Sequence, residues 1–329
     1  MKNERAVLHD RQKRENSMLT FNSQHWAVII GGSSGFGLAS ARKLAEHGMN
    51  LCLVHRDRKG AMSRIAPFFE KLRSHGIELI TFNVDAVSVQ GRTAVLDGLE
   101  KALGRTGKVR LVLHSIALGN LKLLAPCKAS TDSKTAAEQL AEKISVPGER
   151  VHNAVQALFD NGSDALCILA PPPEYNNQMF LGIDDFAGTT HAMGSNIVEW
   201  VQDLHRRLMF AEDARVLTLT SEGNRVAWRG YAAVSAAKAV LEAVSRSMAV
   251  EFAPYGIRSN VIQAGVTDTA ALRAIPGNRH ISARARLRNP FGRLTEPEDV
   301  ANVVFLLCTD ESAWINGAIV RVDGGEAIG

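Results

Sequence analysis

The chain has 329 residues, 46% of them hydrophobic, which is enough to bury the core of one large α/β domain or of two smaller ones. The formal net charge of +4 is mild, and the basic residues are scattered rather than gathered with aromatic ones, which argues against nucleic-acid binding. The longest apolar runs are only as long as strands, so the sequence predicts no membrane partner.

The cysteines and the N-terminus indicate the cellular compartment in which we expect the protein. Cys52, Cys127, Cys167 and Cys308 lie far apart and form no C-x-x-C pair, so the sequence predicts neither a zinc site nor a disulfide framework. The N-terminus lacks the apolar segment that a signal peptide needs. We therefore expect a cytoplasmic protein without a bound metal.

Apolar runs alternate with helical patterns after a charged N-terminal extension, residues 1–24, which we expect to fray or to form a short surface helix. The runs predict strands at residues 26–30, 50–55, 77–82, 109–115, 215–220, 257–262 and 318–322, with helices between them. Repeated strand–helix units favour a parallel sheet covered by helices on both faces. The sequence therefore predicts an α/β fold in which residues 25–329 form a single Rossmann-type, doubly wound sheet of seven parallel strands.

One segment, at about residues 119–180, interrupts this alternation after the fourth predicted strand. It contains helix-like stretches at residues 132–144 and 150–159 and a proline-rich loop at residues 171–177. Crossover connections are normally much shorter, so we interpret the segment as an insertion with structure of its own. Sites in such folds lie at the carboxyl ends of the strands, so the segment is expected to border the substrate entrance; a surface lobe without a role in the reaction is an equal alternative.

A glycine-rich stretch, Gly31-Gly-Ser-Ser-Gly35-Phe-Gly37, follows the first predicted strand and opens a helix. A dinucleotide pyrophosphate needs close backbone approach and free helix N–H groups at this point of the fold. An ordinary strand-to-helix turn would also explain three glycines, but the surrounding strand–helix pattern favours the phosphate site. The predicted contacts are Gly31, Ser33, Ser34, Gly35, Phe36 and Gly37.

The second predicted strand ends at His55 and Arg56, and further basic residues follow. A carboxylate at this tip would accept hydrogen bonds from the ribose hydroxyls of NAD and repel a 2′-phosphate, whereas a guanidinium can bind that phosphate. The sequence therefore favours NADPH over NADH, with His55 and Arg56 as cofactor contacts. A solvated basic surface is the alternative explanation of the charges. Asp57 would favour NAD if a one-residue shift of the turn brought it to the ribose.

Tyr231 stands seven residues before Lys238, and Val234 occupies the position four residues before that lysine. On a helix a partner seven residues away lies about 10.5 Å along the axis and one four residues away about 6 Å, on nearly the same face. A carbonyl reductase needs its acid at the oxygen of the carbon that takes the hydride. An enoyl thioester takes hydride at Cβ and develops charge on a carbonyl oxygen two carbons away. The displaced tyrosine therefore favours the second reaction.

These residues resemble the short-chain dehydrogenase/reductase superfamily, and the Tyr-x6-Lys spacing resembles its enoyl-acyl-carrier-protein reductases. The glycine loop and the loop after Ala264 are most similar to the divergent, NADPH-dependent branch of these enzymes. The resemblance covers about residues 26–118 and 181–329. It implies that Tyr231 donates to the substrate oxygen, that Lys238 fixes the nicotinamide ribose, and that Ser221 is either a substrate contact or a structural cap.

The resemblance also implies cofactor contacts in three further loops. One follows the third predicted strand and would contact the adenine, one follows the fourth, and one would close over the nicotinamide. The residues concerned are Asp85, Ala86, Ser115, Ile116, Ala117, Gly265, Val266, Thr267 and Thr269.

Two further polar residues are given no catalytic role. A histidine that closes a buried strand, as His114 does, is more often a hydrogen-bonded structural residue than a catalyst. Asn196 could position a proton-relay water, but an asparagine in a helix is more often a surface or capping residue.

Together these features predict NADPH-dependent reduction of the 2,3 double bond of an enoyl thioester, carried by acyl carrier protein or coenzyme A, in fatty acid or related synthesis. Reduction of a 3-oxoacyl thioester or another carbonyl is one alternative. A non-catalytic NADP-binding regulator is another. The resemblance also implies a homotetramer or dimer assembled through helices at about residues 181–210 and 231–252.

Overall fold

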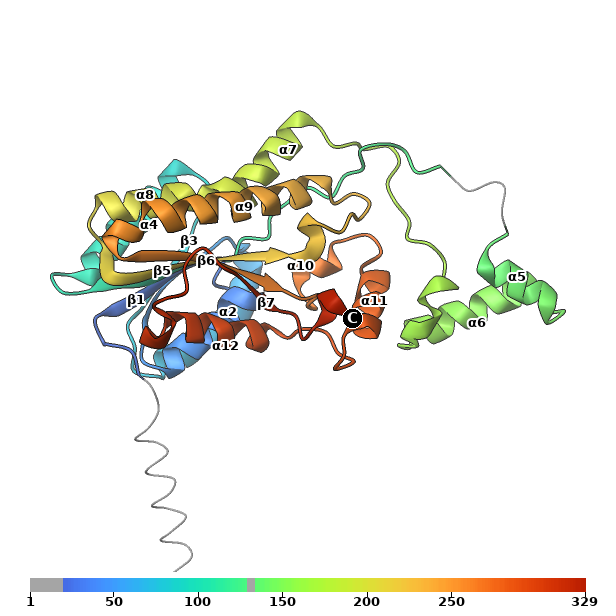
Figure 1. Ribbon diagram of the computed structural model, residues 1–329, viewed down its shortest axis with the longest axis horizontal. Coiled ribbons are helices and arrows are strands. Elements are labelled where there is room, and N and C mark those ends of the chain that lie inside the picture. The colour runs from blue at the N-terminus through green and yellow to red at the C-terminus, as the bar shows by residue number, and fades with distance from the viewer. Residues whose placement is uncertain (1–19, 129–133) are drawn as a thin grey trace, which may run out of the picture.

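Seven parallel strands form one sheet in the order β3-β2-β1-β4-β5-β6-β7, which confirms the predicted doubly wound α/β fold (Figure 1). The structure is a computed structural model that describes residues 20–128 and 134–329. The strands are β1 (His25–Ile30), β2 (Asn50–His55), β3 (Leu79–Asn83), β4 (Lys108–His114), β5 (Phe210–Ser221), β6 (Ile257–Ala264) and β7 (Ile319–Val322).

Helices cover both faces of the sheet (Figure 1). One layer contains α4 (Val89–Leu103), α8 (Asn196–Arg206) and α9 (Ala232–Glu251), and the other contains α2 (Gly35–Glu46), α3 (Met62–Arg73) and α12 (Pro297–Cys308). α7 (Ile183–Thr190) packs on α9 and runs through a π-helical turn (His191–Ser195) into α8.

Two pairs of helices lie outside these layers. α10 (Ala270–Arg273) and α11 (Asn278–Arg288) follow β6, and we call residues 270–288 the lid. The 119–180 segment contains α5 (Ala136–Lys143), α6 (Gly148–Asp160) and a short helical turn (Asp164–Ile168). It projects away from the sheet and its two helical layers, on the side where α11 lies (Figure 1).

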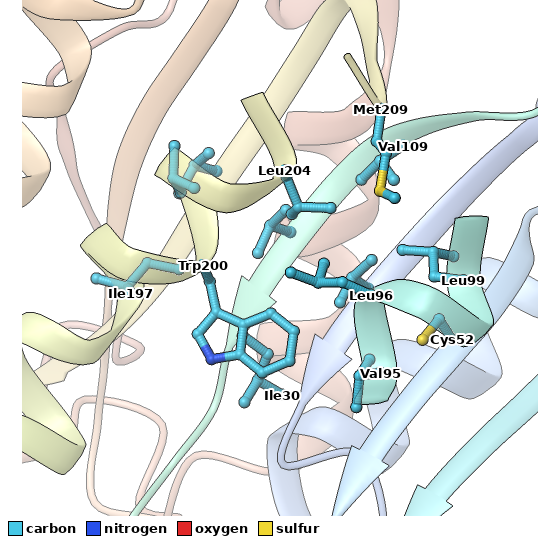
Figure 2. Close-up of a cluster of buried hydrophobic side chains, with 14 of the residues drawn as sticks. Ile30, Cys52, Val95, Leu96, Leu99, Val109, Ile197, Trp200, Leu204 and Met209 are labelled. Atoms are coloured by element: carbon cyan, nitrogen blue, oxygen red, sulfur yellow. The ribbon is translucent and has the colours of Figure 1, made fainter. Parts of the chain in front are cut away.

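Alternation along the strands divides the core into two clusters, one on each face of the sheet. On β1, Val28 enters one cluster and its neighbour Ala27 the other, and both are fully buried. Trp200 of α8 lies in the first cluster beside the apolar side chains of α4 (Figure 2). Its indole N–H donates to the carbonyl oxygen of Ala86 at 3.1 Å, so this cluster also fixes the loop that follows β3.

Some element boundaries differ from the predicted ones. β5 begins at residue 210 rather than at the predicted residue 215. Its first residues pair irregularly with β4 and include the polar residues Glu212 and Asp213, so the apolar run that predicted the strand begins later. Asp132, where the first helix of the 119–180 segment was predicted to begin, and residues 1–19 of the predicted extension lie outside the described residues. Within the described ranges, no helix combines the length and apolar character needed to cross a membrane.

A cluster of arginines joins the amino ends of β4, β5 and β6 around one carboxylate. Arg110 and Arg215 donate to Asp213 at 2.7 and 2.5 Å, and Arg258 donates to the same carboxylate. Arg215 and Arg110 also donate to the carbonyl oxygens of residues 307 and 308 at the end of α12. Burial would raise the pKa of Asp213, but the hydrogen bonds from Arg215 and Arg110 hold it below its ordinary value. The cluster therefore ties three strands to α12.

Asp213→Asn should destabilise the protein by about 1–3 kcal/mol at pH 7, because it removes the charge that three guanidinium groups share. Since the folded-state pKa is depressed, this stabilisation is present above the unfolded-state pKa of about 3.9 and is lost as pH falls through the lower folded value. Urea denaturation at several pH values measures the difference. The control is Asp97→Asn, which removes an exposed partner of Arg207 and should cost less than about 1 kcal/mol. Equal losses for both variants would contradict the assigned role of the cluster.

Candidate functional site

The carboxyl ends of the strands surround a cavity of about 270 Å³. It lies where β1 and β4 are neighbours and the chain connections depart in opposite directions, which is the ligand position in doubly wound folds. The predicted site residues that line it are Phe36, Ser115, Ile116, Ala117, Ser221, Tyr231, Lys238, Gly265, Val266, Thr267 and Thr269.

The other predicted residues adjoin this cavity along the same edge of the sheet without lining it. Gly31, Ser33, Ser34, Gly35 and Gly37 form the loop after β1 and the start of α2. The remaining predicted residues follow or end the next two strands, namely His55, Arg56, Asp85 and Ala86.

The loop after β1 approaches other backbone segments so closely that only glycine fits. Gly31 has a φ of +97°, and a Cβ atom on it would lie 2.5 Å from the carbonyl oxygen of Ser115. A Cβ atom on Gly37 would lie 2.1 Å from the carbonyl oxygen of Gly31. Ser34, the N-cap residue of α2, makes no capping hydrogen bond with its side chain. The close approach of the glycine backbone and the uncapped helix N-terminus fit a dinucleotide pyrophosphate.

The tip of β2 presents an arginine rather than a carboxylate. The side chain of Arg56 is 54% exposed and lies 3.5 Å from Oδ2 of Asp85, whereas the His55 ring is 2% exposed and lies 2.8 Å from Oδ2 of Asp57. Asn83 accepts from the backbone N–H of Asp57 and donates to its carbonyl oxygen, each at 2.9 Å. A one-residue shift that brought Asp57 to a ribose would break these bonds. The buried ring leaves only the backbone of His55 available to a cofactor.

Ser221, Tyr231 and Lys238 meet at one wall of the cavity. Ser221 ends β5, and Tyr231 is the N-cap of α9, one residue before the first helical residue. Burial raises the pKa of Tyr231, and the side chain of Ser221 opposes this shift without reversing it. The phenol is therefore neutral at pH 7 and able to donate.

Lys238 is buried on α9, and its Nζ donates to the carbonyl oxygen of Leu219 at 2.7 Å. Burial lowers the pKa of Lys238 to about 8, and the carboxylate of Glu242 opposes this shift. Glu242 is itself buried and accepts from Oγ1 of Thr220 at 2.7 Å. The sequence interpretation missed Glu242, although its place four residues after Lys238 puts both on one face of the helix.

Val234 fills the position that lies four residues before the lysine. It is 4% exposed and packs with Met193 and Ala237. A Cβ atom on Gly119 would lie 2.6 Å from Cγ2 of Val234, so the surrounding chain closes tightly on this side chain. The hydroxyl donor at this wall therefore comes from Tyr231, one helical turn closer to the start of α9.

The two polar residues without an assigned role lie next to the π-helical turn before α8. His114 is 1% exposed, and burial lowers its pKa to about 3, so the ring is neutral at pH 7. The interpretation of Asn196 as a surface or capping residue is wrong. Its side chain is completely buried, and neither amide atom has a hydrogen-bond partner among the described residues. The π-helical turn, which the sequence pattern did not reveal, rotates this residue inward.

The loop after β6 is anchored by the C-terminal residues. The backbone N–H of Val266 donates to Oε2 of the buried Glu326 at 3.0 Å, and Thr267 donates to the carbonyl oxygen of Gly265 at 3.0 Å. A Cβ atom on Gly35 would lie 3.7 Å from Cγ2 of Thr269. The loop therefore faces the N-terminus of α2 across the cleft, as a segment covering a bound dinucleotide must.

Two family models match successive parts of the chain. A short chain dehydrogenase model matches residues 25–146, and an Enoyl-(Acyl carrier protein) reductase model matches residues 181–326. Together they include the glycine loop of α2 and the wall formed by Ser221, Tyr231 and Lys238.

Curated relatives agree with these models. Over 122 residues the chain is 39% identical to enoyl-[acyl-carrier-protein] reductase [NADH] of Escherichia coli, in an alignment that covers 37% of this chain and 47% of that protein. The chain thus spans about half the length of this and other first relatives. Over 301 residues it is 25% identical to a probable 2,4-dienoyl-CoA reductase of Bacillus subtilis, covering 91% of this chain and 95% of that protein.

A solved structure shares the fold over nearly the whole chain. The enoyl-acyl-carrier-protein reductase of Anaplasma phagocytophilum, in complex with NAD, superposes with a TM-score of 0.66 and 18% sequence identity. The match covers 95% of this chain and 96% of that protein.

Gly37→Ala should weaken the binding of both NADPH and NADH by on the order of tenfold, because overpacking costs about 1–3 kcal/mol and about 1.4 kcal/mol is tenfold in affinity. Titration of the fluorescence of each reduced cofactor measures the change. Gly148→Ala is the matched control, since a Cβ atom there meets nothing within 4 Å. A folded Gly37→Ala protein with unchanged affinity would show that this loop does not hold the dinucleotide.

Proposed function

Because the chain belongs to the short-chain dehydrogenase/reductase superfamily, whose fold binds NAD or NADP, we propose that it is an NADPH-dependent enoyl-thioester reductase. The substrate would be carried by acyl carrier protein or coenzyme A. The observation that carries this proposal is that Tyr231, at the start of α9, lines the cavity together with Ser221, while the buried Val234 fills the position nearer to Lys238. This arrangement offers a donor to a carbonyl oxygen displaced from the carbon that is reduced.

The reaction assigns separate tasks to the residues of this wall. The bound dihydronicotinamide supplies a hydride to Cβ of the substrate. Tyr231 donates to the thioester carbonyl oxygen, where negative charge develops as the enolate forms. Its raised pKa keeps the proton on the phenol until that charge appears. A proton from solvent or from a relay completes the reduction at Cα.

Lys238 would hold the ribose of the cofactor and place positive charge behind the tyrosine. Glu242 stabilises the ammonium group in spite of burial, because its carboxylate lies one turn away on the same helix. The hydrogen bond to the carbonyl oxygen of Leu219 fixes the direction in which Lys238 points. Glu242 therefore acts through the charge of Lys238 and is not a catalytic residue.

The rest of the cavity suits an acyl group. Its lining beyond the catalytic wall is formed mainly by aliphatic and aromatic side chains, among them Leu121, Met193, Val226, Trp228, Leu272, Ile275 and Ile281. A hydrocarbon chain gains free energy by leaving water for such a surface, at roughly 25 cal/mol per Å².

The alternative within the superfamily is reduction of a 3-oxoacyl thioester or another carbonyl. Ser221 favours it, because a serine and a tyrosine hydroxyl that line the same cavity can polarise one carbonyl oxygen together. The aliphatic Val234 disfavours it, since no hydroxyl group is available at that position. A non-catalytic NADP-binding regulator is the alternative outside catalysis. It would still use Lys238 to hold the cofactor, but it leaves the hydroxyl group of Tyr231 in the cavity wall without a role.

The preference for NADPH depends on Arg56. The guanidinium of Arg56 is exposed, and the carboxylate of Asp57 already contacts the ring of His55. Both features favour a 2′-phosphate over a free ribose hydroxyl. The E. coli relative is named for NADH and the A. phagocytophilum structure contains NAD, so this chain would differ from both in its cofactor.

An assembly through α7, α8 and α9 also belongs to the proposal. Ile183 on α7 is 79% exposed and Val250 on α9 is 76% exposed, and a subunit interface over these helices would bury such apolar side chains. We expect a dimer or tetramer, which light scattering of the purified protein measures.

The decisive assay compares enoyl thioesters with the matching 3-oxo thioesters, using the loss of reduced-cofactor absorbance. The proposed function requires turnover of crotonyl or longer enoyl thioesters at a kcat/KM well above that of the 3-oxo compounds. The reverse order would establish the carbonyl reductase. Absence of turnover on both would favour the regulator.

Tyr231→Phe should lower turnover of enoyl thioesters by about 10²-fold or more with little change in NADPH affinity, because it removes a donor used mainly in the transition state. Stopped-flow kinetics and cofactor titration measure the two quantities. Tyr255→Phe, at a tyrosine that is 57% exposed, is the control. Tyr231→Phe combined with Val234→Tyr should not restore enoyl reduction; full rescue would refute the spacing argument.

Arg56→Ala should lower kcat/KM with NADPH by about 10- to 100-fold, since each charge-assisted hydrogen bond to the 2′-phosphate contributes about 1.5–3 kcal/mol. With NADH, which lacks that phosphate, kcat/KM should change little. Steady-state kinetics with both cofactors measure the ratio of kcat/KM with NADPH to kcat/KM with NADH. Arg73→Ala, which removes an exposed arginine of α3 paired with Glu70, is the control. A wild-type preference for NADH, or an equal loss with both cofactors, would refute the assignment.

A further inference from the structure

The lid is built into the core of the 119–180 segment. Ala283 of α11 is completely buried and belongs to a hydrophobic cluster whose other members all come from that segment. They are Ala141, Val151, Val155, Phe159, Cys167 and Ala170, with Val146, Leu166 and Leu169 packed against them. A neighbouring lid residue, Ile281, lines the cavity. One helix therefore serves both as a wall of the site and as part of the core of the segment.

Charges reinforce this contact. Arg286 of α11 donates to both carboxylate oxygens of Asp164, at 2.5 and 2.7 Å, and Arg279 pairs with Asp160. A bidentate arginine–carboxylate pair fixes orientation as well as distance. The 119–180 segment thus holds α11 at a defined place relative to the cavity.

Trp228 stands where the segment, the lid and the catalytic wall meet. Its indole lines the cavity, and Nε1 donates to the carbonyl oxygen of Pro276 in the lid at 3.1 Å. Gly277, with a φ of +77°, follows that carbonyl. A Cβ atom on Gly277 would lie 2.5 Å from Pro173 of the segment and 3.1 Å from the indole ring. The missing side chain thus lets Trp228 and Pro173 close over the lid backbone.

The same tryptophan is tied to the catalytic residue. The backbone N–H of Tyr231 donates to the carbonyl oxygen of Trp228 at 3.1 Å. Arg284 of the lid lies 5.8 Å from the centre of the indole ring, within range of a cation–π contact. The lid therefore holds the side chain of Trp228, and the backbone bond links this residue to Tyr231.

The small size of the cavity means that the position of Trp228 affects how much space the acyl group has. At about 270 Å³ it lies below the range of about 300–1,000 Å³ that is usual for ligand pockets, yet it would have to receive both the nicotinamide and the acyl group. A long acyl chain needs room to extend beyond the cavity, and Trp228 lines the cavity on the side where the segment meets the lid.

On the basis of the proposed function, we propose that Trp228 sets the acyl-chain length of this enzyme and restricts it to short enoyl thioesters. The 119–180 segment supports the restriction, because Pro173 and the pairs of Asp160 and Asp164 hold the lid against the indole. The insertion is then a specificity element rather than a surface lobe without a role.

Kinetics with crotonyl, octenoyl and dodecenoyl thioesters test the proposal. In the wild type, kcat/KM should fall from the shortest to the longest chain. Trp228→Ala should raise the ratio of octenoyl to crotonyl kcat/KM by about tenfold or more, since a single methylene in a closed apolar pocket is worth about 10-fold or more in discrimination. Trp314→Ala, at a tryptophan that is 97% exposed, is the matched control and should keep the wild-type ratio.

Trp228→Phe keeps an aromatic wall but loses the hydrogen bond to Pro276, so its ratio should lie between those of the wild type and the alanine variant. This variant maintains the test if Trp228→Ala does not fold. A wild type that prefers dodecenoyl substrates, or folded Trp228 variants with the wild-type ratio, would overturn the proposal.

Calorimetric binding of the saturated butyryl, octanoyl and dodecanoyl thioesters separates this proposal from the proposed function. Wild type should bind butyryl most tightly, and Trp228→Ala should gain affinity for octanoyl. Length-selective binding without turnover would overturn the enoyl reductase assignment and leave the role of Trp228 standing. Turnover with equal binding of all three lengths would support the enoyl reductase assignment and overturn the role of Trp228. Absence of binding would overturn both proposals.

Discussion

The tight glycine loop between β1 and α2 is the constraint on which the site depends. Only four residues separate the strand from the helix, and a Cβ atom on Gly37 would lie 2.1 Å from the carbonyl oxygen of Gly31, so the first turn of the helix packs directly on the loop. Its N-terminus is therefore aimed at the edge where all seven parallel strands have their carboxyl ends. Residues far apart in the sequence, such as Ser115 and Thr269, reach the same cleft because their strands end at that edge.

A single helix then sets the distances within the catalytic wall. Tyr231, Val234, Lys238 and Glu242 follow one another along one face of α9, so the rise of the helix decides how far each group stands from the next. Burial of the lysine is tolerated because a backbone carbonyl oxygen and a carboxylate both face it. The position of the hydroxyl along this face distinguishes reduction of a carbon–carbon double bond from reduction of a carbonyl.

The sequence predicted the sheet, the glycine loop and the tyrosine–lysine pair, because strand periodicity, tight turns and helical spacing are local properties. It did not predict the inward rotation of Asn196, since a π-helical turn changes the facing of a helix without changing its composition. Trp228 gave no local signal either. Its place depends on Pro276 and Pro173, which are 48 and 55 residues away in the sequence. Such contacts follow from the tertiary fold, which a single sequence does not display.

The burial of Ala283 in the core of the 119–180 segment also links the thermodynamics of two parts of the chain. Opening the lid exposes that core to water, and unfolding the segment removes the packing that orders α11. The two regions therefore share one opening free energy and form a single cooperative unit, whose amide protons exchange with solvent in the same step. A substitution deep in α6, far from any reacting atom, would in this way alter how often the entrance to the cavity opens.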